Sequence, residues 1–124
     1  MQLGQSRSQE CKDFINKVDA GLQAYTSDFI IDSIVIIMEN RNVQTSKILR
    51  FLLALTSSKG LSIYNHTFTD RILAANTMLK SGLTFDDSMV MIAVKALKAK
   101  SVVSFDSHFD DLKGIKRVEP KDLI

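Results

Sequence analysis

Two aspartates in the C-terminal third of the chain, Asp87 and Asp106, have the residue type and the setting of a metal site. Asp87 precedes an apolar helical run over residues 88–97, and Asp106 follows a predicted buried strand over residues 101–105. The start of a helix and the end of the parallel strand after it meet at one edge of an open α/β sheet, where such proteins build their sites. Carboxylates that converge there suit Mg²⁺ or Mn²⁺, hard cations that prefer oxygen ligands and can activate water.

Each aspartate also has a local explanation. Asp87 could be a first-turn acid that accepts from free helix amides, and Asp106 could cap the turn at residues 107–111. We favour the metal interpretation because both acids fall at the same predicted sheet edge.

The elements that must position these acids are predicted by hydrophobic periodicity. Residues 1–7 are expected to form a loose lead-in, and a short helical turn is expected near Asp110. Thr67 and Asp70 have capping-box spacing, and Gly82 follows the end of the same helix. Helices are expected at residues 8–20, 28–40, 45–57, 67–80 and 86–98, and strands at residues 22–27, 61–64, 101–105 and 115–118. This alternation predicts an α/β fold with a short, mainly parallel sheet between helical layers, a three-layer α/β/α sandwich.

Composition predicts a single domain over residues 1–124, with 45% hydrophobic residues and a net charge of +2. That charge neither requires nor excludes a nucleic-acid partner. Cys11 is the only cysteine, which suits a reducing compartment. No apolar run approaches the length of a membrane span and the first residues are too polar for a signal peptide, so we expect a cytoplasmic protein with no membrane partner.

The chain resembles the PIN-domain family of metal-dependent ribonucleases in two segments, residues 84–90 (TFDDSMV) and 101–110 (SVVSFDSHFD). The resemblance covers about residues 10–120 and is strongest after Leu83. It implies a parallel α/β/α sandwich with three or four acids at its site. Two of these acids match Asp87 and Asp106. The others are an aspartate that ends the first, central strand and a glutamate in the helix after the second strand.

The resemblance puts the glutamate at Ser33, which cannot supply an anionic ligand. Asp32 is adjacent, but one helical step turns its side chain by about 100°. Asp32 shares a polar stripe with Asp28 and Glu39, which favours a solvated face. Ser33 shares the apolar stripe of the helix and is therefore expected to face inward; that stripe comprises Phe29, Ile30, Ile36 and Ile37.

Two further residues near Asp106 are weaker metal candidates. Neutral imidazole can bind Mn²⁺, so His108 could be a ligand, although it suits Mg²⁺ poorly and favours an exposed turn. Asp110 could lie in the outer shell of the site, with local capping as the favoured role.

The first strand implied by the resemblance, with its aspartate, has no counterpart before the helix at residues 8–20. Two parallel strands would then lack the partner between them. A shortened chain, a repacked fold and pairing with another copy all remain open as explanations.

The resemblance implies an endoribonuclease of toxin–antitoxin pairs that cleaves RNA with Mg²⁺ or Mn²⁺, with an antitoxin and a second copy as further partners. Because two of the four expected acids are absent, whether the chain is an enzyme stays open. The alternatives are a catalytically degenerate PIN-like protein that acts as an interaction module, and an α/β module whose acids only cap helices. No Gly-rich phosphate loop or CxxC or HExxH motif offers other chemistry.

Overall fold

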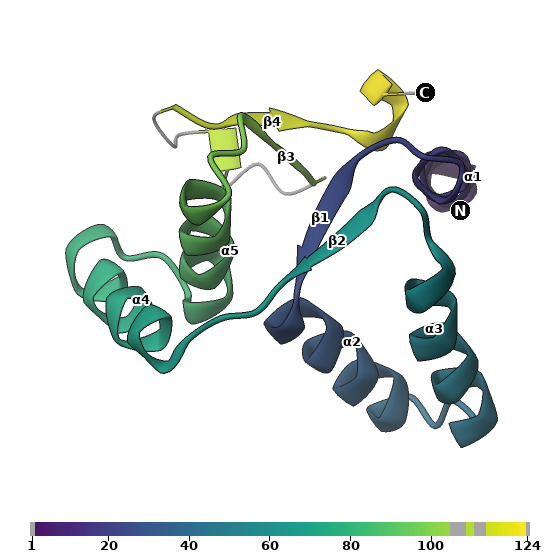
Figure 1. The fold of residues 1–124 in the computed structure, drawn as a ribbon, viewed down its shortest axis with the longest axis horizontal. Coiled ribbons are helices and arrows are strands. Elements are labelled where there is room, and N and C mark those ends of the chain that lie inside the picture. The colour runs from purple at the N-terminus through teal and green to yellow at the C-terminus, as the bar shows by residue number, and fades with distance from the viewer. Residues whose placement is uncertain (1, 105–108, 111–113, 124) are drawn as a thin grey trace.

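The computed structural model describes residues 2–104, 109–110 and 114–123, which Figure 1 shows as a ribbon. These residues form a mixed α/β protein with five α-helices, four strands and a final 3₁₀ helix. The helices are α1 (Gln2–Asp19), α2 (Asp28–Asn40), α3 (Thr45–Ser57), α4 (Phe68–Ser81) and α5 (Phe85–Ala96). The strands are β1 (Ala24–Ser27), β2 (Leu61–Tyr64), β3 (Ser101–Val103) and β4 (Lys116–Val118), and the 3₁₀ helix η2 spans Pro120–Leu123.

The predicted elements are largely present. The predicted bounds of α2, α3 and β2 are confirmed, and the other described ends differ by one or two residues apart from the start of α1. The loose lead-in expected over residues 1–7 is wrong from Gln2 onward, because α1 already begins there. Its first turns contain glutamine, leucine and arginine, which are good helix formers, and no proline. The predicted end of the third strand, at Phe105, lies outside the described residues.

Side-chain caps explain where two of these helices begin. The Ser27 hydroxyl accepts the backbone N–H of Ile30 at the start of α2. At the start of α4, Thr67 and Asp70 form the predicted capping box. Gly82 ends α4 in the left-handed conformation, with φ of 71°, which a residue without Cβ adopts at little cost. Sequence patterns that act over a few residues therefore fix these helix ends.

The strands form two separate parallel pairs. β1 pairs with β2 from Ala24 opposite Leu61 to Ser27 opposite Tyr64, and β3 pairs with β4. The parallel orientation is as predicted, but the expected single sheet is absent from the described residues, which contain two two-stranded sheets. In Figure 1, β1 and β2 cross the centre while β3 and β4 lie above α5. Within the described residues, no segment pairs with both β1 and β3, so the two strand pairs stay separate.

The buried apolar core is small and lies mainly around α5. Met89 and Ala74 are fully buried where α4 packs against α5, and Val94 is also buried. The inward orientation expected for the apolar stripe of α2 is wrong for Ile36 and Ile37, which are 56% and 50% exposed. No residue of α2 or α3 is classed as buried, because few described segments cover these helices.

Gly60 joins the end of α1 to the strands. Its N–H donates to the carbonyl of Val18, and its carbonyl accepts from the N–H of Ala24, each at 2.9 Å. A Cβ at this position would collide with the backbone of Leu22 and Val18, so only glycine allows this approach. Separately, none of the helices in the described residues is both long and apolar enough to cross a membrane.

Candidate functional site

The predicted metal corner is described only on its helical side. Asp87 is half-buried in the first turn of α5, where its backbone N–H donates to the hydroxyl of Thr84, the N-cap residue, at 3.2 Å. Asp106 and His108 lie outside the described residues. The helix start expected at the sheet edge is therefore present, and the pairing of Asp87 with Asp106 stays a prediction.

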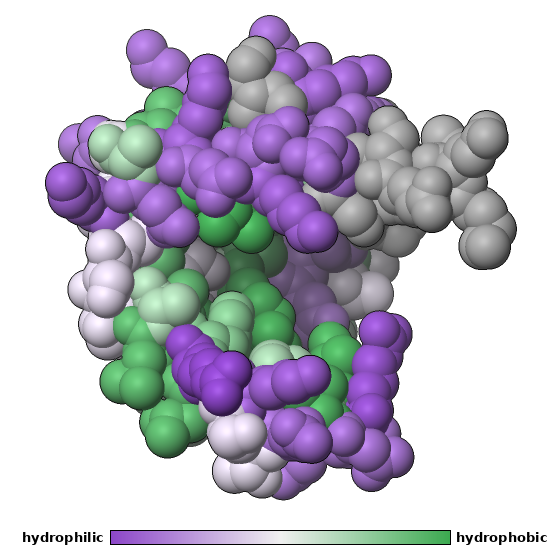
Figure 2. Space-filling model, turned by 90° about the vertical axis from the view of Figure 1, so that its right-hand side faces the viewer, coloured by the Kyte–Doolittle hydropathy of each residue, from purple (hydrophilic) through white to green (hydrophobic). Residues whose placement is uncertain are grey.

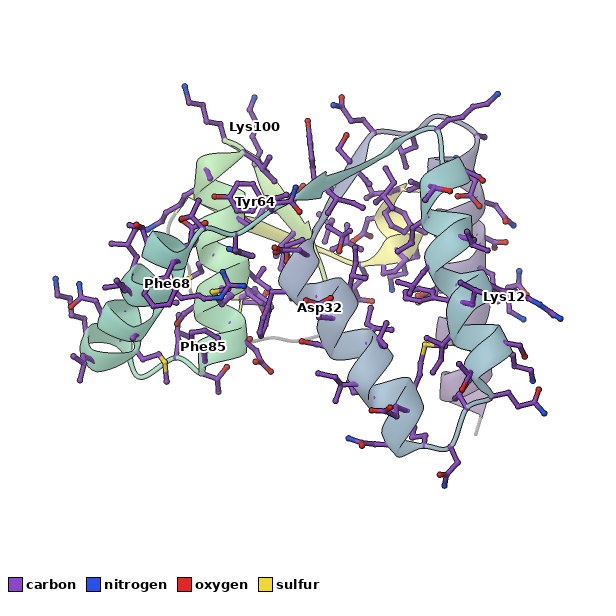
Figure 3. The ribbon with its side chains drawn as sticks, turned by 60° about the horizontal axis from the view of Figure 1, so that its bottom comes forward. Lys12, Asp32, Tyr64, Phe68, Phe85 and Lys100 are labelled. Carbon is purple, nitrogen blue, oxygen red and sulfur yellow. The ribbon has the colours of Figure 1, made fainter. Side chains whose placement is uncertain are left out.

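Ser33 and Asp32, the two α2 positions considered for the glutamate that the resemblance implies, differ in their contacts and exposure. The Ser33 hydroxyl donates to the carbonyl of Phe29 at 2.8 Å, a bond within its own helix. Ser33 is half-buried, whereas Asp32 is exposed on the surface of α2, as predicted for a solvated face (Figure 3). Within the described part of the chain, neither position belongs to a group of three or more His, Cys, Asp or Glu side chains that could hold a metal ion.

Asp110 belongs to a network around Arg117 of β4. The Nε atom of Arg117 lies 2.7 Å from Asp110 Oδ1, and one terminal nitrogen contacts Glu119 and the carbonyl of Ser104. The hydrogen bond to Asp110 is the main cause that raises the pKa of Arg117 above its ordinary value. Asp110 thus has a structural partner in Arg117, an ion pair that the capping role favoured from sequence did not include.

Metal ligation needs a cluster that the described residues do not supply by themselves. Among residues 2–104, 109–110 and 114–123, no group of three or more His, Cys, Asp or Glu side chains lies in a geometry that could hold a metal ion. Any Mg²⁺ or Mn²⁺ site would need side chains such as Asp106 in addition to Asp87.

A polar cluster that the sequence analysis missed lies where β1 and β2 end. Asp28, the first residue of α2, accepts the backbone N–H of His66 at 3.0 Å and that of Phe29 at 2.7 Å. The Tyr64 hydroxyl donates to Asp70 Oδ2 at 2.8 Å. These contacts connect the starts of α2 and α4 to the end of β2. The available sequence signal was Asp28, the acid that directly follows β1.

The chemistry of this cluster is set by Asp70. Burial alone would raise the pKa of its carboxyl, but hydrogen bonds from the Tyr64 hydroxyl and the Thr67 N–H outweigh burial and lower that pKa. The same bond, with burial and the nearby carboxylates, raises the pKa of the Tyr64 phenol. Asp70 is therefore an ionised acceptor and Tyr64 a neutral donor at neutral pH, which is an arrangement that stabilises structure.

His66 is enclosed beside this pair. Its side chain is fully buried, and its Nδ1 lies 3.4 Å from Asp70 Oδ2. This contact does not count as a hydrogen bond, and neither ring nitrogen has a hydrogen-bond partner in the described part of the chain. The ring packs edge-on against Tyr64 and Phe29, with centroids 5.0 and 6.5 Å away. His66 therefore has a packing role in this cluster.

Aromatic packing brings a third helix start to the same place. Phe29 of α2 and Phe85 of α5 meet edge-to-face with centroids 5.6 Å apart. The first turns of α2 and α5 and the segment after β2 therefore converge at one end of the β1–β2 pair, as the α/β pattern predicts. Asp87 lies two residues beyond Phe85, which puts it close in sequence to this junction.

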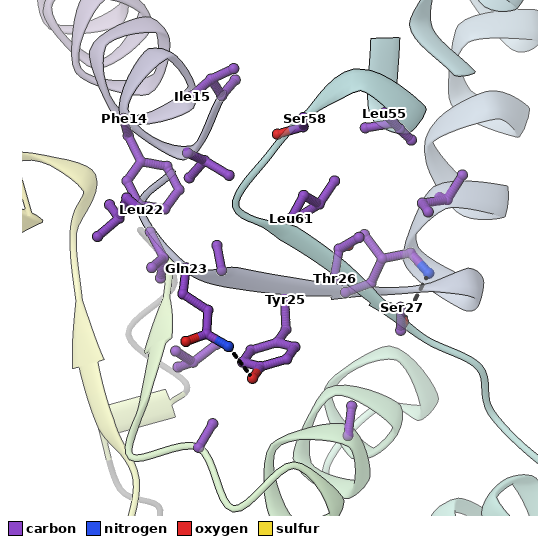
Figure 4. Close-up of a pocket in the computed structure, with 18 of the residues that line it drawn as sticks. Phe14, Ile15, Leu22, Gln23, Tyr25, Thr26, Ser27, Leu55, Ser58 and Leu61 are labelled. Carbon is purple, nitrogen blue, oxygen red and sulfur yellow. Dashed lines mark hydrogen bonds between the residues drawn. The ribbon is translucent and has the colours of Figure 1, made fainter. Parts of the chain in front are cut away.

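The described residues also line an apolar cleft of about 800 Å³ between the two strand pairs. It is lined by residues of β1 and β3 and by apolar side chains of α1, α2, α3 and α5. Figure 2 shows this face hollowed, with hydrophobic side chains around the hollow, and Figure 4 shows the lining residues in detail. In Figure 4, α1 and α3 lie on one side of β1 and α5 lies on the other. The cleft thus lies between β1 of one strand pair and β3 of the other.

Fold and site together define a mixed α/β protein whose two parallel strand pairs flank an open apolar cleft. Comparison of the chain with protein-family models, with curated proteins and with solved structures found no match in any of the three.

Proposed function

We propose that this chain is a PIN-like α/β protein that acts as an interaction module and binds another polypeptide at its central cleft. The observation that carries this proposal is the cleft, whose volume of about 800 Å³ is that of a ligand site. Its lining is predominantly apolar, and large apolar concavities on a protein surface mark interaction sites. A segment bound between the two strand pairs would complete one parallel sheet and a three-layer α/β/α sandwich.

The residues suggested as replacement metal ligands support an interaction module over a nuclease. Ser33 is hydrogen-bonded within α2, Asp32 is exposed, and Asp110 is paired with Arg117. Each side chain therefore has a surface or structural role.

A metal-dependent ribonuclease is the second candidate function, and the position of Asp87 favours it. Asp87 is half-buried in the first turn of α5, close in sequence to the aromatic junction at the end of β1 and β2. On this hypothesis Asp87 and Asp106 hold Mg²⁺ or Mn²⁺, which activates water for attack on a phosphodiester of accessible single-stranded RNA. An antitoxin and a second copy would then be its protein partners.

One experiment separates the two functions. Purified protein is incubated with RNA and Mn²⁺, Mg²⁺ or EDTA, beside an Asp87→Asn/Asp106→Asn double variant. The interaction module predicts no metal-dependent cleavage that distinguishes the two proteins. Metal-dependent cleavage that the double variant lacks would overturn the module and support the nuclease.

A second experiment tests partner binding directly. A photo-crosslinking amino acid replaces Leu55, which lines the cleft, or Leu79, which is 87% exposed on α4 and does not line it. We expect one defined polypeptide to crosslink in cells at position 55 and not at position 79. Equal crosslinking at the two positions, or none at either, would contradict binding in the cleft.

A further inference from the structure

Among the residues that the structure describes, the edge of β1 that faces away from β2 has backbone groups without a backbone partner. Successive residues along a strand direct their N–H and C=O groups to opposite edges, and the N–H of Ala24 donates to the carbonyl of Gly60 on the β2 side. The N–H and C=O of Tyr25 therefore point to the other edge. In the described part of the chain, no backbone group pairs with them.

The edge of β3 that faces away from β4 is open in the same way. The N–H of Ser104 donates to the carbonyl of Val118, and the carbonyl of Lys100 accepts from Lys116. The N–H and C=O groups of even-numbered residues in this strand thus face β4, while those of Ser101 and Val103 point outward. These groups also lack a backbone partner among the described residues.

Both open edges border the same apolar cleft. Its lining includes Tyr25 of β1, and Ser101 and Val103 of β3. An extended backbone carries N–H and C=O groups on both of its edges, so a single strand can satisfy β1 and β3 together. A helix satisfies its own backbone groups internally and would leave both edges unpaired. Hydrogen-bond complementarity therefore selects an extended strand as the occupant.

The cleft also specifies the side chains of this strand. Alternate side chains of an inserted strand point to opposite faces, and each face of the cleft is covered by helices. The helices α1 and α3 lie on one side of β1 and α5 lies on the other. Among the lining residues, α1 and α3 supply Phe14 and Phe51, and α5 supplies Val90 and Val94. A parallel strand buried on both faces is a near-continuous run of Val, Ile or Leu.

We propose that an extended, β-branched apolar segment of a partner polypeptide inserts between β1 and β3 and joins the two strand pairs into one sheet. This inference rests on the proposed function and names the chemistry of its partner. The run needs only about four to five residues, because β1 and β3 span four and three residues. In Figure 4, β1 and β3 run in different directions, and twist of about 20–25° per strand step absorbs part of that difference. A rotation of the two strand pairs toward each other supplies the rest.

Amide hydrogen exchange of the full chain tests this pairing. The probe is a peptide with about five central Val and Ile residues, flanked by lysines for solubility. Its control has proline at the central position, which removes a donor and disrupts an inner strand. We expect the amides of Tyr25 and Val103 to exchange at least ~10-fold more slowly with the probe and unchanged with the control. The amides of Ala24 and Ser104, already bonded within their pairs, serve as internal references for the native fold.

A variant of the protein gives a matched test. Tyr25→Pro removes the outward N–H of β1 and leaves the bonds to β2 intact, since the Tyr25 N–H is not used there. We expect it to keep the exchange pattern of Ala24 while its affinity for the probe falls at least ~10-fold.

Three results would overturn strand insertion. The first is equal binding of probe and proline control, and the second is probe binding without slower exchange at Tyr25 and Val103. The third is slower exchange at these amides when the concentration of the protein alone is raised, because the occupant would then be a second copy. None of these results would be evidence for metal-dependent RNA cleavage, which the RNA assay tests separately. Failure of strand insertion is thus distinct from failure of the interaction module.

Discussion

The carboxylate of Asp28 and the backbone N–H of His66 are joined by a 3.0 Å hydrogen bond between residues that are 38 positions apart. This bond connects the first turn of α2, directly after β1, to the segment that follows β2. The same Oδ1 atom also accepts the N–H of Phe29. A single side chain therefore fixes the helix start and the strand ends relative to each other.

Replacement of Asp28 by alanine should lower the free energy of unfolding by about 1–3 kcal/mol, because it leaves the N–H groups of Phe29 and His66 without this acceptor. Urea denaturation followed by circular dichroism measures the change. The matched control is Asp32→Ala on the exposed face of the same helix, which should alter stability by no more than about 0.5 kcal/mol. Equal effects of the two substitutions would contradict the structural role of Asp28.

Replacement of Asp70 by asparagine should destabilise the protein at neutral pH and have less effect in acid. The pKa of Asp70 is lower in the folded state than its ordinary value of 3.8, so its ionised form contributes stability above that pH. This contribution is lost as the pH falls through the lower folded pKa. Urea midpoints of the natural protein and Asp70→Asn at pH 7 and near pH 3 should therefore differ most at pH 7. A difference that grows in acid would refute this linkage.

Tyr64→Phe should abolish an alkaline loss of stability. The pKa of Tyr64 is raised in the folded state, so the protonated phenol contributes stability below pH 10.0 that is lost as the pH rises through the folded pKa. The urea midpoint of the natural protein should fall in this range more steeply than that of the variant. In a double-mutant cycle with Asp70→Asn at pH 7, we expect coupling of about 0.5–3 kcal/mol, and additive effects would show that the two side chains do not interact.

Gly60→Ala should be much more damaging than Gly82→Ala. A Cβ at Gly60 would overlap the backbone of Leu22 and Val18, and no flexible side chain can move aside. At Gly82 no atom lies within 4 Å of the added Cβ, so only the left-handed φ of 71° opposes alanine, at a cost of about 1–2 kcal/mol. Thermal unfolding of the two variants compares them, and similar melting temperatures would exclude a close backbone approach at Gly60.

Local patterns predicted the elements well because their causes lie within a few residues. The capping pair Thr67–Asp70 and the glycine at position 82 act on neighbouring amides, and both were found as predicted. The Asp28–His66 bond escaped prediction because it depends on how two distant segments meet. The apolar stripe of α2 led to the wrong orientation for Ile36 and Ile37. A hydrophobic stripe shows that burial would be favourable, but it does not show whether another segment of the chain packs against it. The pairing of Asp87 with Asp106 stays a prediction.

The strand edges at Tyr25 and Val103, which lack a backbone partner among the described residues, also affect the tendency of the protein to aggregate in the cell. A strand edge with unpaired backbone groups is a template for any extended chain, including a partly unfolded copy of the same protein. If a partner segment covers these edges, binding stabilises the folded state in proportion to the logarithm of the partner's concentration. Synthesis in excess over the partner would leave molecules prone to aggregation. The two polypeptides would then require matched production, as subunits of an obligate complex do.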